Sequence, residues 1–262
     1  MKSKWKRIIK KVKKNQFLFE ELVKRDFKQK YKGTVLGILW SVLSPLLHLF
    51  VMKLVFTQFF GRNTPHYTTY LFAGNVLFSY FRESTKGGMN ALVSNKKVFS
   101  KINVPKYIFL LSKNVSTIIN LGLTILVFFL FAALDGIQFG WHFITLVYPI
   151  VCLVMLSVGM GLILSAMFVF FRDTKYLYDV FLQLLHYMSA IFYKVDHYSQ
   201  GVQNIFLLNP VYCAIKYVRM VTIDGVIPDV RLHILLLAYG LAAILIGGMI
   251  YKKKNHKFLY YM

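Results

Sequence analysis

The stretch Leu22–Pro45, LVKRDFKQKYKGTVLGILWSVLSP, joins a basic amphipathic segment directly to a long apolar one. Around its start, apolar side chains recur four residues apart, at Phe19, Val23, Phe27 and Tyr31. A helix with this pattern and a charged opposite side lies in the plane of a membrane surface. Because residues 34–60 are almost wholly apolar, we expect the chain to turn near Gly33 and Gly37 and then to cross the bilayer.

The composition indicates an integral membrane protein. Of the 262 residues, 57% are hydrophobic, and several apolar runs exceed the roughly 20 residues that span a bilayer. The net charge of +22 collects in short segments beside these runs, which fits membrane topology and contact with lipid head groups better than nucleic-acid binding. The basic segment Met1–Lys14 is interpreted either as a helix on an anionic leaflet or as a disordered tail.

We predict an all-α fold with six transmembrane helices, at about 34–60, 67–86, 106–134, 141–171, 176–195 and 230–251. Residues 1–33 would form a cytoplasmic interfacial segment and residues 34–262 the six-helix transmembrane domain. With this assignment, 26 of the 32 Lys and Arg residues fall on one side or in its connections. Because basic residues favour the cytoplasmic side, both termini are expected there.

Two of the segments that connect predicted spans are themselves predicted to be helical. Residues 87–105, GGMNALVSNKKVFSKINVP, mix apolar and basic residues, which favours a short amphipathic helix that docks on a cytoplasmic partner. A loop resting on lipid is the alternative. The apolar stretch 205–221 is interrupted by Asn209-Pro210 and carries Lys216 and Arg219. It therefore predicts a re-entrant or surface-lying helical hairpin before the last span.

Several kinds of chemistry are poorly supported. The sequence has no GxxxxGK[ST] phosphate-binding loop, no histidine pattern typical of a metal site and no GxSxG elbow. The deep ionisable candidates Lys53, His48 and His186 lack the carboxylate that ion-coupled transport needs. Cys152 and Cys213 are expected to be free. We therefore expect no catalytic, metal or cofactor site in this chain.

The first segment resembles the opening of the membrane subunits of type-2 ABC exporters, which move lipid-linked polysaccharides, O-antigens and teichoic acids. The matching residues are Arg25-Asp26, Lys30-Tyr31, Thr34, Leu36-Gly37, Trp40 and Pro45. Further matches are Arg172-Asp173 at an internal cytoplasmic turn, and Asn209-Pro210 with Tyr217 and Arg219 before the last span. Val104-Pro105-Lys106 stands where the family usually has Phe-Pro-Arg.

The resemblance implies a bacterial cytoplasmic-membrane subunit that works as a homodimer with two copies of a separate ABC ATPase. ATP and Mg would bind that partner, and this chain would be no enzyme by itself. The residues expected to couple to the ATPase are Asn95, Lys96, Lys97, Val98, Phe99, Lys101 and Ile102. The interfacial gate helix would be formed around Arg25, Asp26, Phe27, Lys30 and Tyr31.

Aromatic side chains in the first and fifth predicted spans are candidates for lining a passage, because ring faces suit the apolar faces of sugars. These residues are Trp40, Phe50, Phe56, Phe181, Tyr187 and Phe192. Ordinary helix packing is the alternative interpretation. At the level of the whole protein, the alternatives are an ABC exporter of small drugs or lipids, and a membrane enzyme or scaffold of envelope synthesis.

Overall fold

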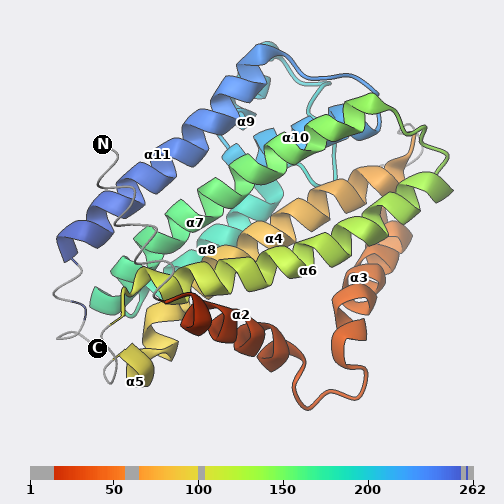
Figure 1. Ribbon diagram of the computed structural model, residues 1–262. Coiled ribbons are helices and arrows are strands. Elements are labelled where there is room, and N and C mark those ends of the chain that lie inside the picture. Colours follow the sequence, from red (N-terminus) through yellow and green to blue (C-terminus); the bar gives the residue numbers. More distant parts are fainter. Residues whose placement is uncertain (1–14, 57–64, 100–103, 255–257, 259–262) are drawn as a thin grey trace.

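The computed structural model describes residues 15–56, 65–99, 104–254 and 258, and within these ranges it is helical with no strand. The amphipathic segment forms α2 (Gln16–Tyr31), which lies across one end of the longer helices (Figure 1). After it, Gly33 (φ +79°) and Gly37 (φ +52°) adopt left-handed conformations that glycine tolerates best. The short helix η1 (Gly37–Leu39) then leads into α3 (Trp40–Phe56). The predicted turn between surface helix and first span is confirmed.

The second helix, α4 (Tyr67–Ser94), is longer than predicted. The predicted end of this helix at residue 86 is wrong, because the helix continues through Gly87 and Gly88. The cytoplasmic placement of residues 87–94 stays a prediction. A Cβ at Gly88 would lie 2.9 Å from the Cα of Gly161, so the glycine permits close contact with the neighbouring helix. Only a short helix, α5 (Lys96–Phe99), remains of the predicted amphipathic helix in the described residues.

Two long apolar helices follow. They are α6 (Tyr107–Leu134) and α7 (Val147–Phe170), the latter preceded by η3 (Trp141–Leu146). The last helix, α11 (Val230–Lys254), packs along α7. A Cβ at Gly159 of α7 would lie 2.3 Å from the carbonyl carbon of Ala243 in α11. The interpretation of the α7 glycines as close-packing positions is thus confirmed.

The predicted fifth span, residues 176–195, extends seven residues beyond the end of the observed helix. Its helix, α8 (Thr174–Met188), ends early, and Ala190 has a positive φ of 48°. Fifteen residues reach only about 22 Å at 1.5 Å per residue, against a bilayer core of about 30 Å.

Among the described residues, four helices are long and apolar enough to cross a membrane: Gly37–Phe56, Tyr107–Leu134, Trp141–Phe170 and Val230–Lys254. α4 has the length, but it carries Arg82, Glu83 and Lys86. The six-span count and the cytoplasmic placement of both termini therefore stay predictions.

The segment before the last span forms the predicted helical hairpin, α9 (Gln200–Phe206) and α10 (Pro210–Thr222). The side-chain oxygen of Asn209 accepts hydrogen bonds from the backbone N–H groups of Val211 (2.9 Å) and Tyr212 (3.2 Å), and Pro210 begins the helix. Most of α10 is buried, and it packs against α4, α7 and α11. The re-entrant or membrane-surface position of this segment stays a prediction.

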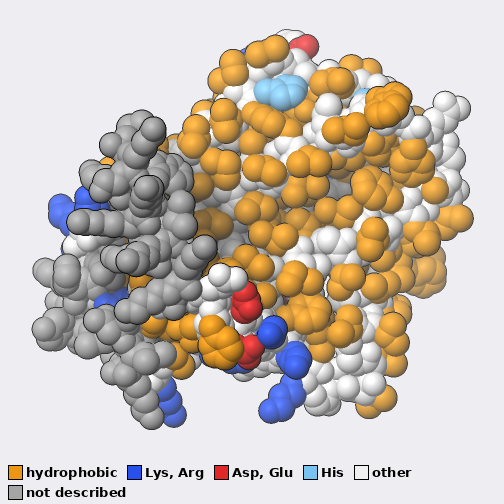
Figure 2. Space-filling model, in the orientation of Figure 1, with side chains coloured by type: hydrophobic (Ala, Val, Ile, Leu, Met, Phe, Trp, Pro, Cys, Tyr) orange, Lys and Arg blue, Asp and Glu red, His pale blue; other side chains and the backbone are white. Residues whose placement is uncertain are grey.

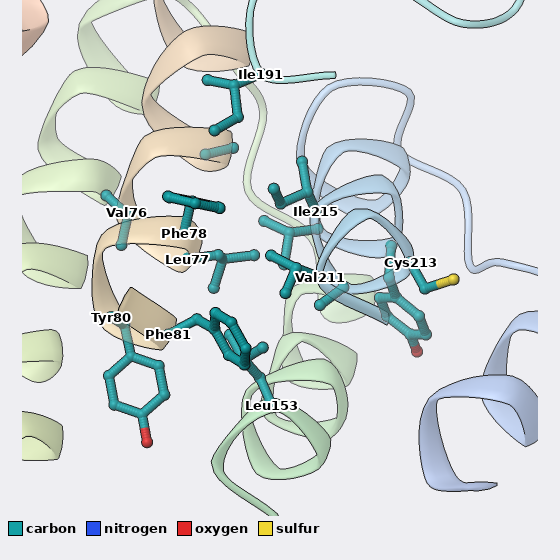
Figure 3. Close-up of a cluster of buried hydrophobic side chains, with 14 of the residues drawn as sticks. Val76, Leu77, Phe78, Tyr80, Phe81, Leu153, Ile191, Val211, Cys213 and Ile215 are labelled. Atoms are coloured by element: carbon teal, nitrogen blue, oxygen red, sulfur yellow. The ribbon is translucent and has the colours of Figure 1, made fainter. Parts of the chain in front are cut away.

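The hydrophobic core lies where α4, α7 and α10 meet. Figure 3 shows side chains of α4 and α10 directed toward one another, with Leu153 of α7 and Ile191 beside them. Cys213 is part of this cluster, and both Cys152 and Cys213 are buried and free. The prediction of free cysteines is confirmed.

Candidate functional site: a polar cavity between four helices

A cavity of about 1550 Å³ lies between α2, η1–α3, α4 and α6. Its size exceeds that of a site for a drug-sized ligand, which is typically about 300–1,000 Å³. Hydrophobic side chains cover most of the face seen in Figure 2, whereas acidic and basic side chains gather where Figure 1 places α2. Polar and apolar residues together line the cavity.

Two of its walls are polar stripes with helical spacing. On α4 the polar lining residues recur three or four positions apart, except for the adjacent pair Arg82-Glu83; they are Asn75, Ser79, Arg82, Glu83, Lys86, Asn90 and Ser94. On α6 they are Lys113, Thr117, Asn120 and Thr124. Residues three and four apart share a helix face, so each helix turns one hydrophilic face to the cavity. Such polar groups are costly inside a membrane and usually mark a substrate or ion pathway.

The third wall is α2, which is tied to the base of the cavity by buried polar contacts. Asp26 is only 5% exposed, and its carboxylate accepts hydrogen bonds from Arg25 (2.8 Å) and Ser112 of α6 (3.4 Å). The Arg25 guanidinium also donates to the side chain of Asn95, at 2.8 Å. Because Asn95 immediately precedes α5, the interfacial helix and the predicted coupling segment are directly joined.

The far end of α2 has its own connections. The Lys30 ammonium lies 2.6 Å from a carboxylate oxygen of Glu83 on α4. The Tyr31 hydroxyl donates to the side chain of Asn120 on α6, at 2.7 Å, and both residues are buried. Phe27 packs edge-on against the Tyr31 ring at 5.5 Å. The five predicted gate-helix residues thus lie on one helix, and Arg25, Asp26, Lys30 and Tyr31 also line the cavity.

The predicted coupling residues occupy different environments. Lys96 and Lys97 are exposed on α5, whereas Asn95 is buried. Val98 is partly buried and packs near Leu22 of α2 and Ile108 of α6. The side chain of Phe99, and Lys101 and Ile102 altogether, fall outside the described residues. Their coupling role stays a prediction.

The predicted channel aromatics do not converge on the cavity. Trp40 lines it, but Phe50, Phe181 and Tyr187 are exposed on α3 and α8. Phe192 is buried and stacks on Phe56 at 4.4 Å, which is a packing contact. The structure therefore does not gather the six residues in one place, and their role as a lining stays a prediction.

At the internal turn between α7 and α8, Arg172 and Asp173 are both exposed. The Arg172 guanidinium lies 5.3 Å from the ring centre of Phe168. Nearby, Asp179 forms an ion pair with Lys86 of α4, at 2.6 Å. This pair links α8 to the cavity wall.

A second polar feature, at the opposite end of α4, centres on Arg219 of α10. Its guanidinium is buried and donates to the backbone carbonyls of Tyr70 (3.1 and 3.2 Å), Ala190 (2.8 Å) and Ile191 (2.9 Å). It also lies 3.4 Å from the centre of the Tyr70 ring. Arg219 thereby holds the chain just after the end of α8, where Ala190 has its positive φ.

The cavity residues of α4 and α6 were not predicted from the sequence. A signal was present, since Asn75, Ser79, Glu83 and Asn90 recur at helical spacing within an otherwise apolar segment. The partners across the cavity, such as Asn120 opposite Tyr31, have no comparable local signal.

The chain matches one protein-family model and is similar to several known export proteins. A family model described as ABC-2 type transporter matches residues 18–223. The chain is 25% identical over 245 residues to an O-antigen export system permease protein RfbA of Myxococcus xanthus, covering 92% of this chain and 94% of that protein. It is 26% identical over 247 residues to an RfbA of Klebsiella pneumoniae, with coverages of 92% and 95%. It is 24% identical over 245 residues to the polysialic acid transport protein KpsM of Escherichia coli, with coverages of 92% and 94%.

Proposed function

Because this chain belongs to the ABC-2 type transporter family, we propose that it is the membrane subunit of an ATP-driven exporter of a cell-surface polysaccharide. The observation that carries the proposal is similarity to O-antigen and polysialic acid export proteins over 92% of the chain. The substrate is a lipid-linked glycan, such as an O-antigen or a teichoic acid, that crosses the cytoplasmic membrane.

The cavity supports a hydrophilic substrate. Its α4 and α6 walls offer amide and hydroxyl groups, among them Asn75, Ser79 and Thr117, and these suit the hydroxyls of sugars. Apolar residues such as Trp40, Val76 and Leu121 line the cavity beside these groups. The cavity can thus contact both the hydroxyls and the apolar ring faces of a glycan.

A separate ATPase supplies the energy in this proposal, because the sequence has no phosphate-binding loop. The ATPase docks on the end of the molecule that carries Lys96 and Lys97. Movement of α5 is then transmitted to α2 through the hydrogen bond between Asn95 and Arg25. Since α2 is a wall of the cavity, ATP binding by the partner changes the shape of the substrate path.

Two copies of the chain complete the channel in this proposal. Large apolar side chains are exposed on α3, including Phe50 and Leu54, and on α8, including Phe181 and Leu184. Exposed apolar surface of this kind faces either lipid or another protein in a membrane. The predicted aromatic lining would form only between two such faces.

The experiment is depletion of this chain in its native host. We expect the polysaccharide to disappear from the cell surface and the lipid-linked glycan to accumulate inside, with both effects reversed by a plasmid copy. Tagged protein should retain an ABC ATPase during purification. Unchanged surface polysaccharide in fully depleted cells would refute the proposal.

A further inference from the structure

A second cavity, of about 280 Å³, lies at the opposite end of α4 from the cavity beside α2. The start of α4, the chain that follows α8, and α10 enclose it, and Figure 1 shows α10 far from α2. Sites for small molecules typically begin at about 300 Å³, so this space suits a ligand of about one sugar residue. In the proposed function the ATPase docks beside α5, so this cavity lies at the exit end of the molecule.

The floor of this exit cavity carries a buried positive charge. Arg219 lines the cavity and is only 6% exposed. Its guanidinium donates four hydrogen bonds to backbone carbonyls. Among the described residues, however, no carboxylate lies within 4.0 Å of it. Its hydrogen bonds are therefore satisfied while its charge has no counter-ion, and an uncompensated buried charge favours an anion nearby.

Two further cations and a buried phenol line the same cavity. Lys194, which follows α8, and Lys216 of α10 are both half-buried, and neither forms an ion pair with a described carboxylate. Tyr212 of α10 is 4% exposed, and its hydroxyl has no hydrogen-bond partner in the described part of the chain. A buried hydroxyl normally has a partner, so the unpaired phenol indicates that a ligand or water atom belongs in the cavity.

The exposed residues at the mouth of the exit cavity are acidic. Asp196 and Asp224 both line it, and both are exposed. Within the described ranges neither carboxylate takes part in an ion pair. Ionised carboxylates only accept hydrogen bonds, so they suit hydroxyl donors. The cavity therefore presents cationic donors inside and anionic acceptors at its mouth.

We propose that the exit cavity binds one hexuronate residue, a six-carbon sugar acid, at the end or on a branch of the exported glycan. The sugar carboxylate lies between Lys194 and Lys216 and accepts a hydrogen bond from the hydroxyl of Tyr212. Hydroxyl groups on the rest of the ring donate to the two aspartates at the mouth. This inference rests on the proposed function, because it assigns an acidic sugar to the exported glycan and a site to that sugar.

The test is a binding measurement on the full-length chain together with its co-purified ATPase in lipid nanodiscs. Three probes separate the contributions: methyl glucuronide, methyl glucoside and acetate. We expect methyl glucuronide to bind saturably and at least about tenfold more tightly than either of the others, since only it offers both the anion and the hydroxyls. Equal affinity for the glucoside would overturn the anion site, and equal affinity for acetate would overturn the sugar. Absence of saturable glucuronide binding would overturn the proposal as a whole.

Variants locate the site. Lys216→Gln should raise the Kd for methyl glucuronide about tenfold, and Tyr212→Phe should raise it severalfold, since each removes a hydrogen bond to the carboxylate. Lys216→Arg keeps the charge and should retain most of the binding. The melting temperature of each variant is measured alongside, which separates loss of fold from loss of binding.

The matched controls are Lys175→Gln and Tyr176→Phe, because both residues are exposed at the start of α8 and line neither cavity. Their Kd for methyl glucuronide should equal that of the wild type. An unchanged Kd in both Lys216→Gln and Tyr212→Phe would refute the inference.

The outcome is distinguishable from failure of the proposed function. Binding is measured on purified protein, whereas export is measured in depleted cells. Loss of surface polysaccharide on depletion, combined with no glucuronide binding, would overturn the site alone. Failure of the proposed function would appear as normal surface polysaccharide after depletion.

Discussion

Replacing Arg219 tests how the hairpin is held to the rest of the molecule. In Arg219→Met, the carbonyls of Tyr70, Ala190 and Ile191 lose a buried partner that donates four hydrogen bonds. An unpaired buried carbonyl costs roughly 1–3 kcal/mol, so three of them cost on the order of 3–6 kcal/mol, allowing for partial relaxation. At roughly 2–4 °C per kcal/mol for a chain of this size, the melting temperature should fall by about 10 °C.

The assay uses the chain's own cysteines. Cys152 and Cys213 are buried and free, so a thiol-reactive fluorescent dye reports unfolding of the detergent-solubilised protein. Arg231→Met is the matched control, because Arg231 is exposed and makes a single 3.4 Å hydrogen bond to Asn204. Its melting temperature should change by less than about 2 °C. If Arg219→Met had the same melting temperature as the wild type, the reasoning about the buried guanidinium would be wrong.

Three further predictions follow from the packing and from the α2–α5 contact. Gly159→Ala should lower the melting temperature because its Cβ would meet the α11 backbone at 2.3 Å, whereas Gly122→Ala, which has no neighbour within 4 Å, should leave it unchanged or raise it. A double-mutant cycle with Arg25→Ala and Asn95→Ala should give a coupling free energy of about 1 kcal/mol in the same melting assay, and additivity would argue against the contact. Changing both Lys96 and Lys97 to Glu should reduce ATPase co-purification several-fold, while Arg231→Glu at the other end of the molecule should not; equal retention by both would remove the docking assignment.

The α2–α3 junction was predictable because its signals are local. The four-residue spacing of apolar side chains defines the face of α2, and Gly33 and Gly37 supply the conformations that the turn requires. The cap of α10 was equally local, since Asn209 and Pro210 form the start of that helix themselves.

The two incorrect boundaries depend on contacts between distant segments. Gly87 and Gly88 indicate the end of a helix when the sequence is considered alone, yet α4 continues because Gly88 packs against Gly161, 73 positions away along the sequence. Just after the end of α8, the carbonyl of Ala190 accepts a hydrogen bond from Arg219, 29 positions further along the sequence. Neither contact leaves a pattern in the local sequence.

The cavity illustrates a different difficulty. Hydropathy averaged along α4 does not separate the polar face formed by Asn75, Ser79 and Asn90 from the apolar residues between them. Of the six predicted lining aromatics, only Trp40 lies at the cavity, whereas Phe56 and Tyr187 pack against Phe192. The exposed positions of Phe50 and Phe181 favour a lining formed between two copies of the chain.

The central claim is that this chain is a conduit driven by a separate ATPase. Its most direct test uses inside-out vesicles that contain this chain and its co-purified ATPase, with a radiolabelled lipid-linked glycan in the outer leaflet. We predict that the glycan becomes protected from an added glycosidase only when ATP and both proteins are present. Protection without the ATPase, or ATP hydrolysis by this chain alone, would contradict the claim.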